Sequence, residues 1–174
     1  MRLDDSVIVR LWSEYNGHPK VNIIVTSHPL ELLHFNLMGP TRTESLGGKR
    51  YIMVVVDFSR YSWVEFLREN SEACKKMEKL CKRLQNEKGV PIAKIRSDHG
   101  KKFKNVKFET FCSENGIKKE FSTQKTAQQN GVVERKNCVI QEMARMILLN
   151  KDIPQKFWGE VVNTLCYIGN RIFF

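Results

Sequence analysis

The stretch that most constrains this chain is residues 51–67, YIMVVVDFSRYSWVEFL. It holds two runs of β-branched and aromatic residues on either side of the letters DFSR, a pattern typical of two strands joined by a turn. The apolar run at 31–38 precedes it, and a Gly-Gly turn at 47–48 separates the two stretches. The sequence therefore predicts three consecutive antiparallel strands.

The rest of the chain alternates between helical and strand patterns. Residues 71–88 carry apolar side chains at the spacing of one helix face, and Gly89 and Pro91 end this helix. Residues 1–28 show no clear periodicity, and we expect a poorly ordered N-terminal arm there. The order βββαβαβαα predicts an α/β fold with a mixed sheet flanked by helices. The remaining predicted elements are a strand at 92–97, a short helix at 106–115, a strand at 117–121, a long helix after the polar loop, and a final helix that begins near Pro154.

The net charge narrows the choice of partners. The 174 residues carry a formal charge of +10, which favours a polyanion such as nucleic acid, with an acidic membrane surface second. The alternative is charge that serves only solubility. No apolar run reaches the roughly 18–20 residues that span a bilayer. The five cysteines include no CxxC pair, which favours reduced thiols in an intracellular protein and argues against a structural zinc site.

A polar residue interrupts the apolar run ELLHFNLMGP at 31–40. Asn36 lies in the middle of the predicted strand, and a buried amide costs free energy unless it is hydrogen-bonded. The residues alone leave three alternatives open. Asn36 is a structural polar group, a functional ligand, or the remains of one.

Two carboxylates stand at positions where an α/β sheet presents ligands. Asp98 follows the predicted strand that ends in IRS, and Glu134 lies near the start of the long helix. Carboxylates that converge at such a place hold divalent metal for phosphoryl chemistry, and hard oxygen ligands suit Mg²⁺ or Mn²⁺. The alternative is a pair of solvated surface charges.

The amino-acid sequence around Asp98 and Glu134 is similar to that of a known family. Residues 29–171 resemble the integrase catalytic core of Ty1/copia-type LTR retrotransposons, almost without a gap and in the family's order. The spacing of Asp98 and Glu134, with 35 residues between them, is that of the second and third acids of DDE integrases. The matching stretches are HPLELLHFNLMGP, ESLGGKRYIMVVVDFSRYSWVEFL, LCKRLQNEKG, IRSDHGKKF, FETFCSENGIKKEFS, QQNGVVERKN, EMARMILL and IPQKFWGEVVNTLCYIGNR.

The resemblance implies an RNase H-like fold and two-metal DNA strand transfer with Mg²⁺ or Mn²⁺. It makes Asp98 and Glu134 metal-binding catalytic residues. The family's first acid is the Asp of its H-x-D-L-x-G-P strand, and Asn36 stands at that position. An amide brings no charge to a metal, so this departure predicts impaired catalysis. Asp57, at the end of the neighbouring strand, is a candidate replacement. Further departures from the family's pattern occur at Val56, Lys102, Gln124, Ala127 and Cys138.

Basic residues gather between residues 101 and 136. We interpret those next to the two acids as contacts to DNA phosphates, and the QQN loop as a segment that reaches bases or phosphates. A solvated helix face and a flexible start of the helix are the alternatives. The predicted DNA-binding residues are Lys101, Lys102, Gln128, Gln129, Asn130, Arg135 and Lys136.

We therefore predict that residues 29–174 form an integrase core-like domain, truncated at its C-terminus, around a central five-stranded mixed sheet. The ancestry implied is that of a polynucleotidyl transferase with impaired activity. DNA and a homo-oligomer through the core are the expected partners, with no membrane and no small-molecule substrate, and the nucleus is the expected location of a functional protein. The alternative is a non-catalytic nucleic-acid-binding or interaction module derived from a retrotransposon polyprotein.

Overall fold

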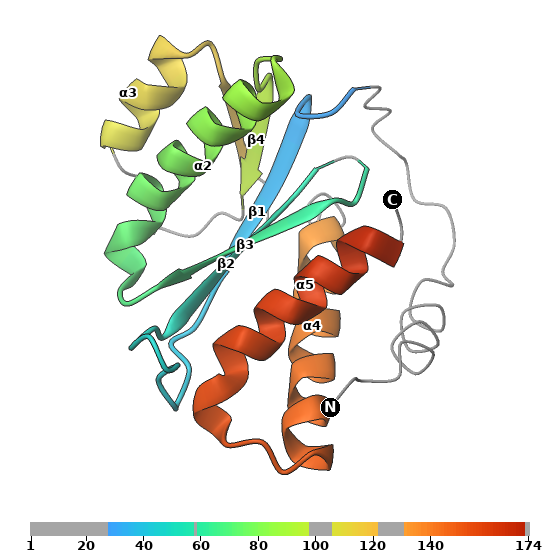
Figure 1. Ribbon diagram of the computed structural model, residues 1–174. Helices are drawn as coiled ribbons and strands as arrows, with labels where there is room; N and C mark the ends of the chain where they lie inside the picture. The colour runs from blue at the N-terminus through green and yellow to red at the C-terminus, as the bar shows by residue number, and fades with distance from the viewer. Residues whose placement is uncertain (1–27, 58, 98–105, 122–130, 173–174) are drawn as a thin grey trace.

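A five-stranded sheet forms the centre of the molecule (Figure 1). The computed structural model describes residues 28–57, 59–97, 106–121 and 131–172. The predicted arm at 1–28 falls almost entirely outside these ranges, so its order stays a prediction. The strands are β1 (Leu32–Met38), β2 (Tyr51–Val56), β3 (Ser62–Leu67), β4 (Lys94–Ser97) and β5 (Lys118–Phe121). The helices are α2 (Ala73–Lys88), α3 (Val106–Glu114), α4 (Gly131–Asn150) and α5 (Trp158–Ile172), with 3-10 turns at η1 (Asn70–Glu72) and η4 (Gln155–Phe157).

The strands lie in the order β3-β2-β1-β4-β5. β1 pairs with β2 and β2 with β3 in antiparallel fashion, whereas β4 is parallel to both β1 and β5. The mixed sheet with three antiparallel strands at its start is therefore confirmed. β4 begins at Lys94 rather than at residue 92 as predicted, because Ile92 is buried in the core but precedes the ladder with β1.

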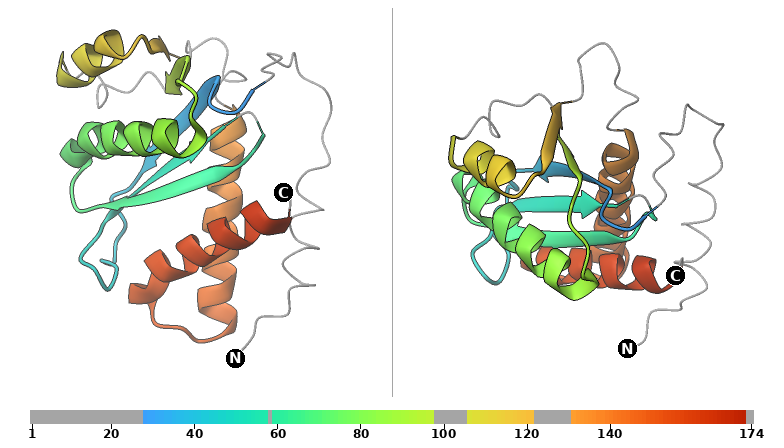
Figure 2. Two further views of the ribbon diagram at one scale, coloured as in Figure 1. Left: turned by 45° about the horizontal axis from the view of Figure 1, so that its top comes forward. Right: turned by 90° about the horizontal axis from the view of Figure 1, so that it is seen from above.

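Helices cover both faces of the sheet. Figures 1 and 2 show α2 and α3 on one face and α4 and α5 on the other. Strand alternation explains the two cores, because successive side chains of β1 point to opposite faces. Leu33 and Phe35 join the core under α2 and α3, whereas Met38 packs against the core under α4 and α5.

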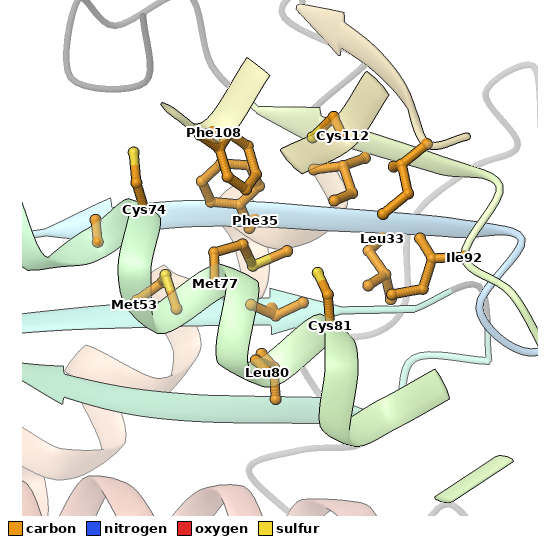
Figure 3. Close-up of a cluster of buried hydrophobic side chains, with 14 of the residues drawn as sticks. Leu33, Phe35, Met53, Cys74, Met77, Leu80, Cys81, Ile92, Phe108 and Cys112 are labelled. Carbon is orange, nitrogen blue, oxygen red and sulfur yellow. The ribbon is translucent and has the colours of Figure 1, made fainter. Parts of the chain in front are cut away.

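The core on one face of the sheet includes the buried face of α2, the helix at residues 71–88 in the sequence prediction. Figure 3 shows Phe35 and Met53 of the sheet facing Met77 of α2 and Phe108 of α3. Helix α2 ends at Gly89, whose left-handed φ of 66° lets its backbone N–H donate to the carbonyl of Gln85. The helix begins at Ala73, two residues later than predicted, because η1 forms its first turn.

The end of β1 requires a glycine. Gly39 has a φ of 127°, and a Cβ there would lie 2.6 Å from the carbonyl oxygen of Arg50. The close approach lets the chain leave β1 and return as β2, which sets the register that places Asn36 opposite Val54. No helix in the described ranges is long and apolar enough to cross a bilayer.

Candidate functional site

Asn36 lies on the sheet face that α4 covers. It is the register partner of Val54, and Val54 belongs to the core under α4 and α5. The Asn36 side chain is half-buried and makes no hydrogen bond to any residue in the described ranges. A half-buried amide keeps contact with water, and on this face of the sheet it is also available to a ligand.

Glu134 lies in the first turn of α4, the helix that packs on β1 and β2. Its side chain is exposed, and a carboxylate at a helix N-terminus is favoured by the helix dipole. The amide of Gln141 contacts the sulfur of Met38, which fixes this face of α4 over β1. Glu134 stands two turns before Gln141, toward the start of α4. The structure therefore brings Glu134 to the face of the sheet that carries Asn36.

Asp98 lies outside the described residues, as do Lys101, Lys102, Gln128, Gln129 and Asn130. The strand that precedes it is described, and Ser97 is the register partner of Phe35 in the parallel ladder between β1 and β4. β4 thus ends beside the residue just before Asn36. The predicted roles of Asp98 and of these five residues stay predictions.

Asp57 does not take the place of the missing acid. Its neighbour Val56 is the partner of His34, so Asp57 follows the ladder three positions from the Asn36–Val54 pair, about 10 Å along the strands. Burial raises the pKa of the Asp57 carboxyl, while a 2.6 Å hydrogen bond from the Ser59 hydroxyl opposes the shift. The charge that acts on it comes from Lys88 at the end of α2, on the other side of the sheet. Asp57 is a residue of the turn, remote from Asn36.

Positive charge gathers where α4 begins. Burial lowers the pKa of Lys136 to about 8, Cys166 opposes the shift, and the charge of Arg60 adds to it. Burial and the charge of Arg135 also lower the pKa of Arg60. Arg60 was missed by sequence reasoning, because nothing in the DFSR turn indicates that its arginine reaches α4.

A second missed residue is Asn137. It is 4% exposed on the sheet-facing side of α4, and neither polar atom of its side chain has a hydrogen-bond partner in the described ranges. α4 and β1 run in the same general direction (Figure 1). Four helical residues rise about 6 Å and two strand residues about 6.6 Å. Asn137, four residues before Gln141, thus comes level with Asn36, two residues before Met38. A polar residue in the apolar repeat of α4 was the signal that could have revealed it.

A buried ion pair joins the two strands on the far side of β1. The guanidinium of Arg96 lies 2.5 Å from a carboxylate oxygen of Glu120, its register partner on β5. The hydrogen bond from Arg96 holds the pKa of Glu120 below its usual value. Arg96 is also the register partner of His34 on β1. His34 lies two residues before Asn36, so both side chains point to the same face of the sheet. The pair joins β5 to β4 one residue before β4 ends at Ser97.

The donors at this site are hard oxygens, the type that a divalent ion such as Mg²⁺ prefers. Among the described residues, however, no three His, Cys, Asp or Glu side chains come together as a metal site. Asn36 supplies an amide oxygen without charge, and Glu134 is the one predicted metal ligand whose position is described. The predicted set of metal ligands, with an amide where the resemblance implies a carboxylate, therefore stays a prediction.

Comparison with known protein families shows to which family the chain belongs. The model of the integrase core domain matches residues 28–127. The chain belongs to the integrase core domain family. The match begins just before β1 and continues past β5, so it includes Asn36 and the whole sheet of this integrase core.

Individual relatives agree with the family. The integrase core is 36% identical over 143 residues to the retrovirus-related Pol polyprotein from transposon TNT 1-94 of Nicotiana tabacum, covering 82% of this chain and 11% of that protein. It is 28% identical over 150 residues to the corresponding polyprotein from transposon RE2 of Arabidopsis thaliana, covering 86% of this chain and 10% of that protein. The chain thus spans about a tenth of the length of these relatives.

Solved structures show the same fold. The HTLV-2 integrase catalytic core domain, in complex with magnesium and in a trimeric form, matches 80% of this chain and 84% of its own with a TM-score of 0.57 and 22% identity. The simian T-cell lymphotropic virus intasome, in complex with a PP2A regulatory subunit, matches 86% of this chain and 51% of its own with a TM-score of 0.63 and 17% identity. The RNase H-like fold of the integrase core is therefore confirmed.

Proposed function

We propose that this integrase core binds DNA as part of a retrotransposon Pol polyprotein and that its metal-dependent strand transfer is impaired. The proposal rests on the position of Asn36. Its half-buried amide lies on the face of β1 that is covered by α4, the helix that bears Glu134. We infer that Asp98, directly after β4, is the other acid of the site and that a functional protein acts in the nucleus.

Charge is the reason for the impairment. Two divalent ions held together at about 3.5–4 Å repel each other, and carboxylates between them offset that repulsion. An amide oxygen occupies the same volume but adds no negative charge. Loss of one such group costs on the order of 3–4 kcal/mol of transition-state stabilisation, which is roughly 10²–10³ in rate. Binding of DNA does not need this charge, because Lys and Arg contacts to phosphates provide it.

A second candidate function is a non-catalytic DNA-binding module with the same fold. The positive charges of Arg135 and Lys136 near the start of α4, together with Arg60 of the β2–β3 connection, favour it, since basic side chains bind DNA phosphates without metal. The net charge of +10 is consistent with both functions.

Strand transfer in the presence of Mn²⁺ separates the two functions. We expect the Asn36→Asp variant to join a labelled duplex end to target DNA roughly 10²–10³ times faster than the native chain. The double variant Asn36→Asp with Glu134→Gln is the control, and it should return to the native rate. Equal rates for the native chain and for the Asn36→Asp variant, at a measurable level, contradict the impairment. Absence of transfer by both chains, with DNA binding retained, supports the non-catalytic module.

A further inference from the structure

The connection between β2 and β3 holds an arginine in an unusual backbone conformation. Arg60 has a φ of 74°, in the left-handed region that side chains other than glycine, asparagine and aspartate seldom adopt. The backbone N–H of Arg60 donates to the carbonyl of Asp57, and that of Asp57 donates to the carbonyl of Tyr61. Such conformations persist only where the surroundings impose them, and they concentrate at functional sites.

Helix α5 fixes this connection from the other side. The amide of Asn170 accepts from the backbone N–H of Ser62 at 2.9 Å and donates to its carbonyl at 2.7 Å, as a neighbouring strand would. The thiol of Cys166 donates to the same carbonyl at 3.2 Å. The views in Figures 1 and 2 place the connection next to the N-terminal part of α4. Arg60 is thus carried on a rigid support beside α4.

Like charges meet at this point. Arg135 lies near the start of α4, beside the connection that carries Arg60 (Figures 1 and 2), and its charge acts on the Arg60 guanidinium. Arg60 and Arg135 are both exposed, and neither forms an ion pair within the described ranges. The nearest acid of the turn, Asp57, accepts from Ser59 and is buried. Positive groups that act on each other in this way repel until an anion lies between them, and the N-terminus of a helix adds to the attraction for that anion.

We propose that Arg60 and Arg135 together bind one backbone phosphate of duplex DNA. Guanidinium groups suit this ligand, because their planar donors match the oxygens of a phosphate in bidentate fashion. The site extends the DNA-binding surface from the start of α4 across the β2–β3 connection, to a residue that the family resemblance did not single out. The inference rests on the proposed function for the identity of the polyanion, but it needs neither metal nor catalysis.

Binding of a fluorescently labelled duplex in EDTA, measured over a range of salt concentrations, tests the site. Arg60→Gly and Arg60→Asn both suit the left-handed backbone and remove the charge. We expect each variant to bind about five- to tenfold more weakly at low salt. The slope of log affinity against log salt should fall, but by less than about 0.9, the value for one phosphate contact, because Arg135 still contacts the phosphate. The midpoint of thermal unfolding should be unchanged or raised, because the variants relieve both backbone strain and repulsion.

Two control variants sharpen the result. Lys151→Gln removes an exposed charge just after the other end of α4 and should change neither affinity nor slope. Arg60→Lys keeps the charge but not the planar donors, so it should keep the slope and lose part of the affinity. Unchanged affinity and slope in both neutral variants of Arg60, with steep salt dependence in the native chain, overturn the phosphate site and leave the proposed function intact. A native chain without salt-dependent DNA binding overturns both.

Discussion

At the scale of single residues, the candidate site contains two asparagine side chains, those of Asn36 and Asn137. Asn36 is half-buried and Asn137 is buried, and neither side chain is hydrogen-bonded within the described ranges. Both face the interface between β1 and α4. An unpaired buried amide costs about 1–3 kcal/mol, whereas a partly exposed one retains contact with water. The two residues therefore contribute differently to stability, and Asn137 is the one whose cost can be measured.

Replacement of Asn137 by leucine should stabilise the fold. Leucine has nearly the shape of asparagine and removes both unpaired polar atoms, so we expect unfolding to cost about 1–2 kcal/mol more than in the native chain. Asn170→Leu is the matched control, because it removes an amide that makes three hydrogen bonds with Ser62. That variant should lose about 1–2 kcal/mol or more. Chemical denaturation measures both changes, and an equal loss in the two variants would show that Asn137 has a partner.

At the scale of elements, an ion pair joins the edge strand β5 to β4. Arg96 and Glu120 are register partners on β4 and β5, and the Arg96 side chain is 8% exposed whereas that of Glu120 is 23% exposed. The four-residue strand β5 also pairs with β4 through the backbone ladder, and Lys119 forms an ion pair with Glu109 of α3. Loss of the negative charge of Glu120 would remove a carboxylate from beside a buried guanidinium, and removing one partner of such a pair costs more than the pair itself contributes.

The pH dependence of unfolding tests this ion pair. Because Arg96 lowers the pKa of Glu120 in the folded state, the contribution of Glu120 to stability is present above the unfolded pKa of about 4.5 and is lost as the pH falls below it. Glu120→Gln should lower the unfolding midpoint near pH 6. The difference from the native chain should shrink as the pH approaches about 3. Thermal unfolding at several pH values measures it, and a difference that stays constant with pH would rule out this role for the pair.

At the scale of the whole molecule, periodicity was sufficient to predict the sheet and its helices. The β-branched runs around residues 51–67 predicted β2 and β3, and the apolar spacing of Met77, Leu80 and Leu84 predicted the buried face of α2. The role of Asn36 as a site residue stays a prediction from the family pattern. The sequence did not indicate Arg60 or Asn137, because a left-handed turn and the level of a helix residue above a strand are set by tertiary packing.

The fold depends on the volume of the residue at position 36, whereas metal binding depends on its charge. The sheet and both cores form around Asn36, because an amide and a carboxylate have nearly the same volume. Under the proposed function, the two differ in the charge that faces α4. We therefore expect a stable integrase core that binds DNA and holds divalent metal weakly.

Calorimetric titration of Mn²⁺ into the protein without DNA measures how much the amide of Asn36 weakens metal binding. We expect weak binding by the native chain, and an Asn36→Asp variant that binds at least about tenfold more tightly, since about 1.4 kcal/mol of added attraction gives that factor. Glu134→Gln in the Asn36→Asp background should cancel the gain, which assigns it to the site between β1 and α4. Equal Mn²⁺ affinity in the native chain and in the Asn36→Asp variant would show that the amide of Asn36 does not weaken metal binding.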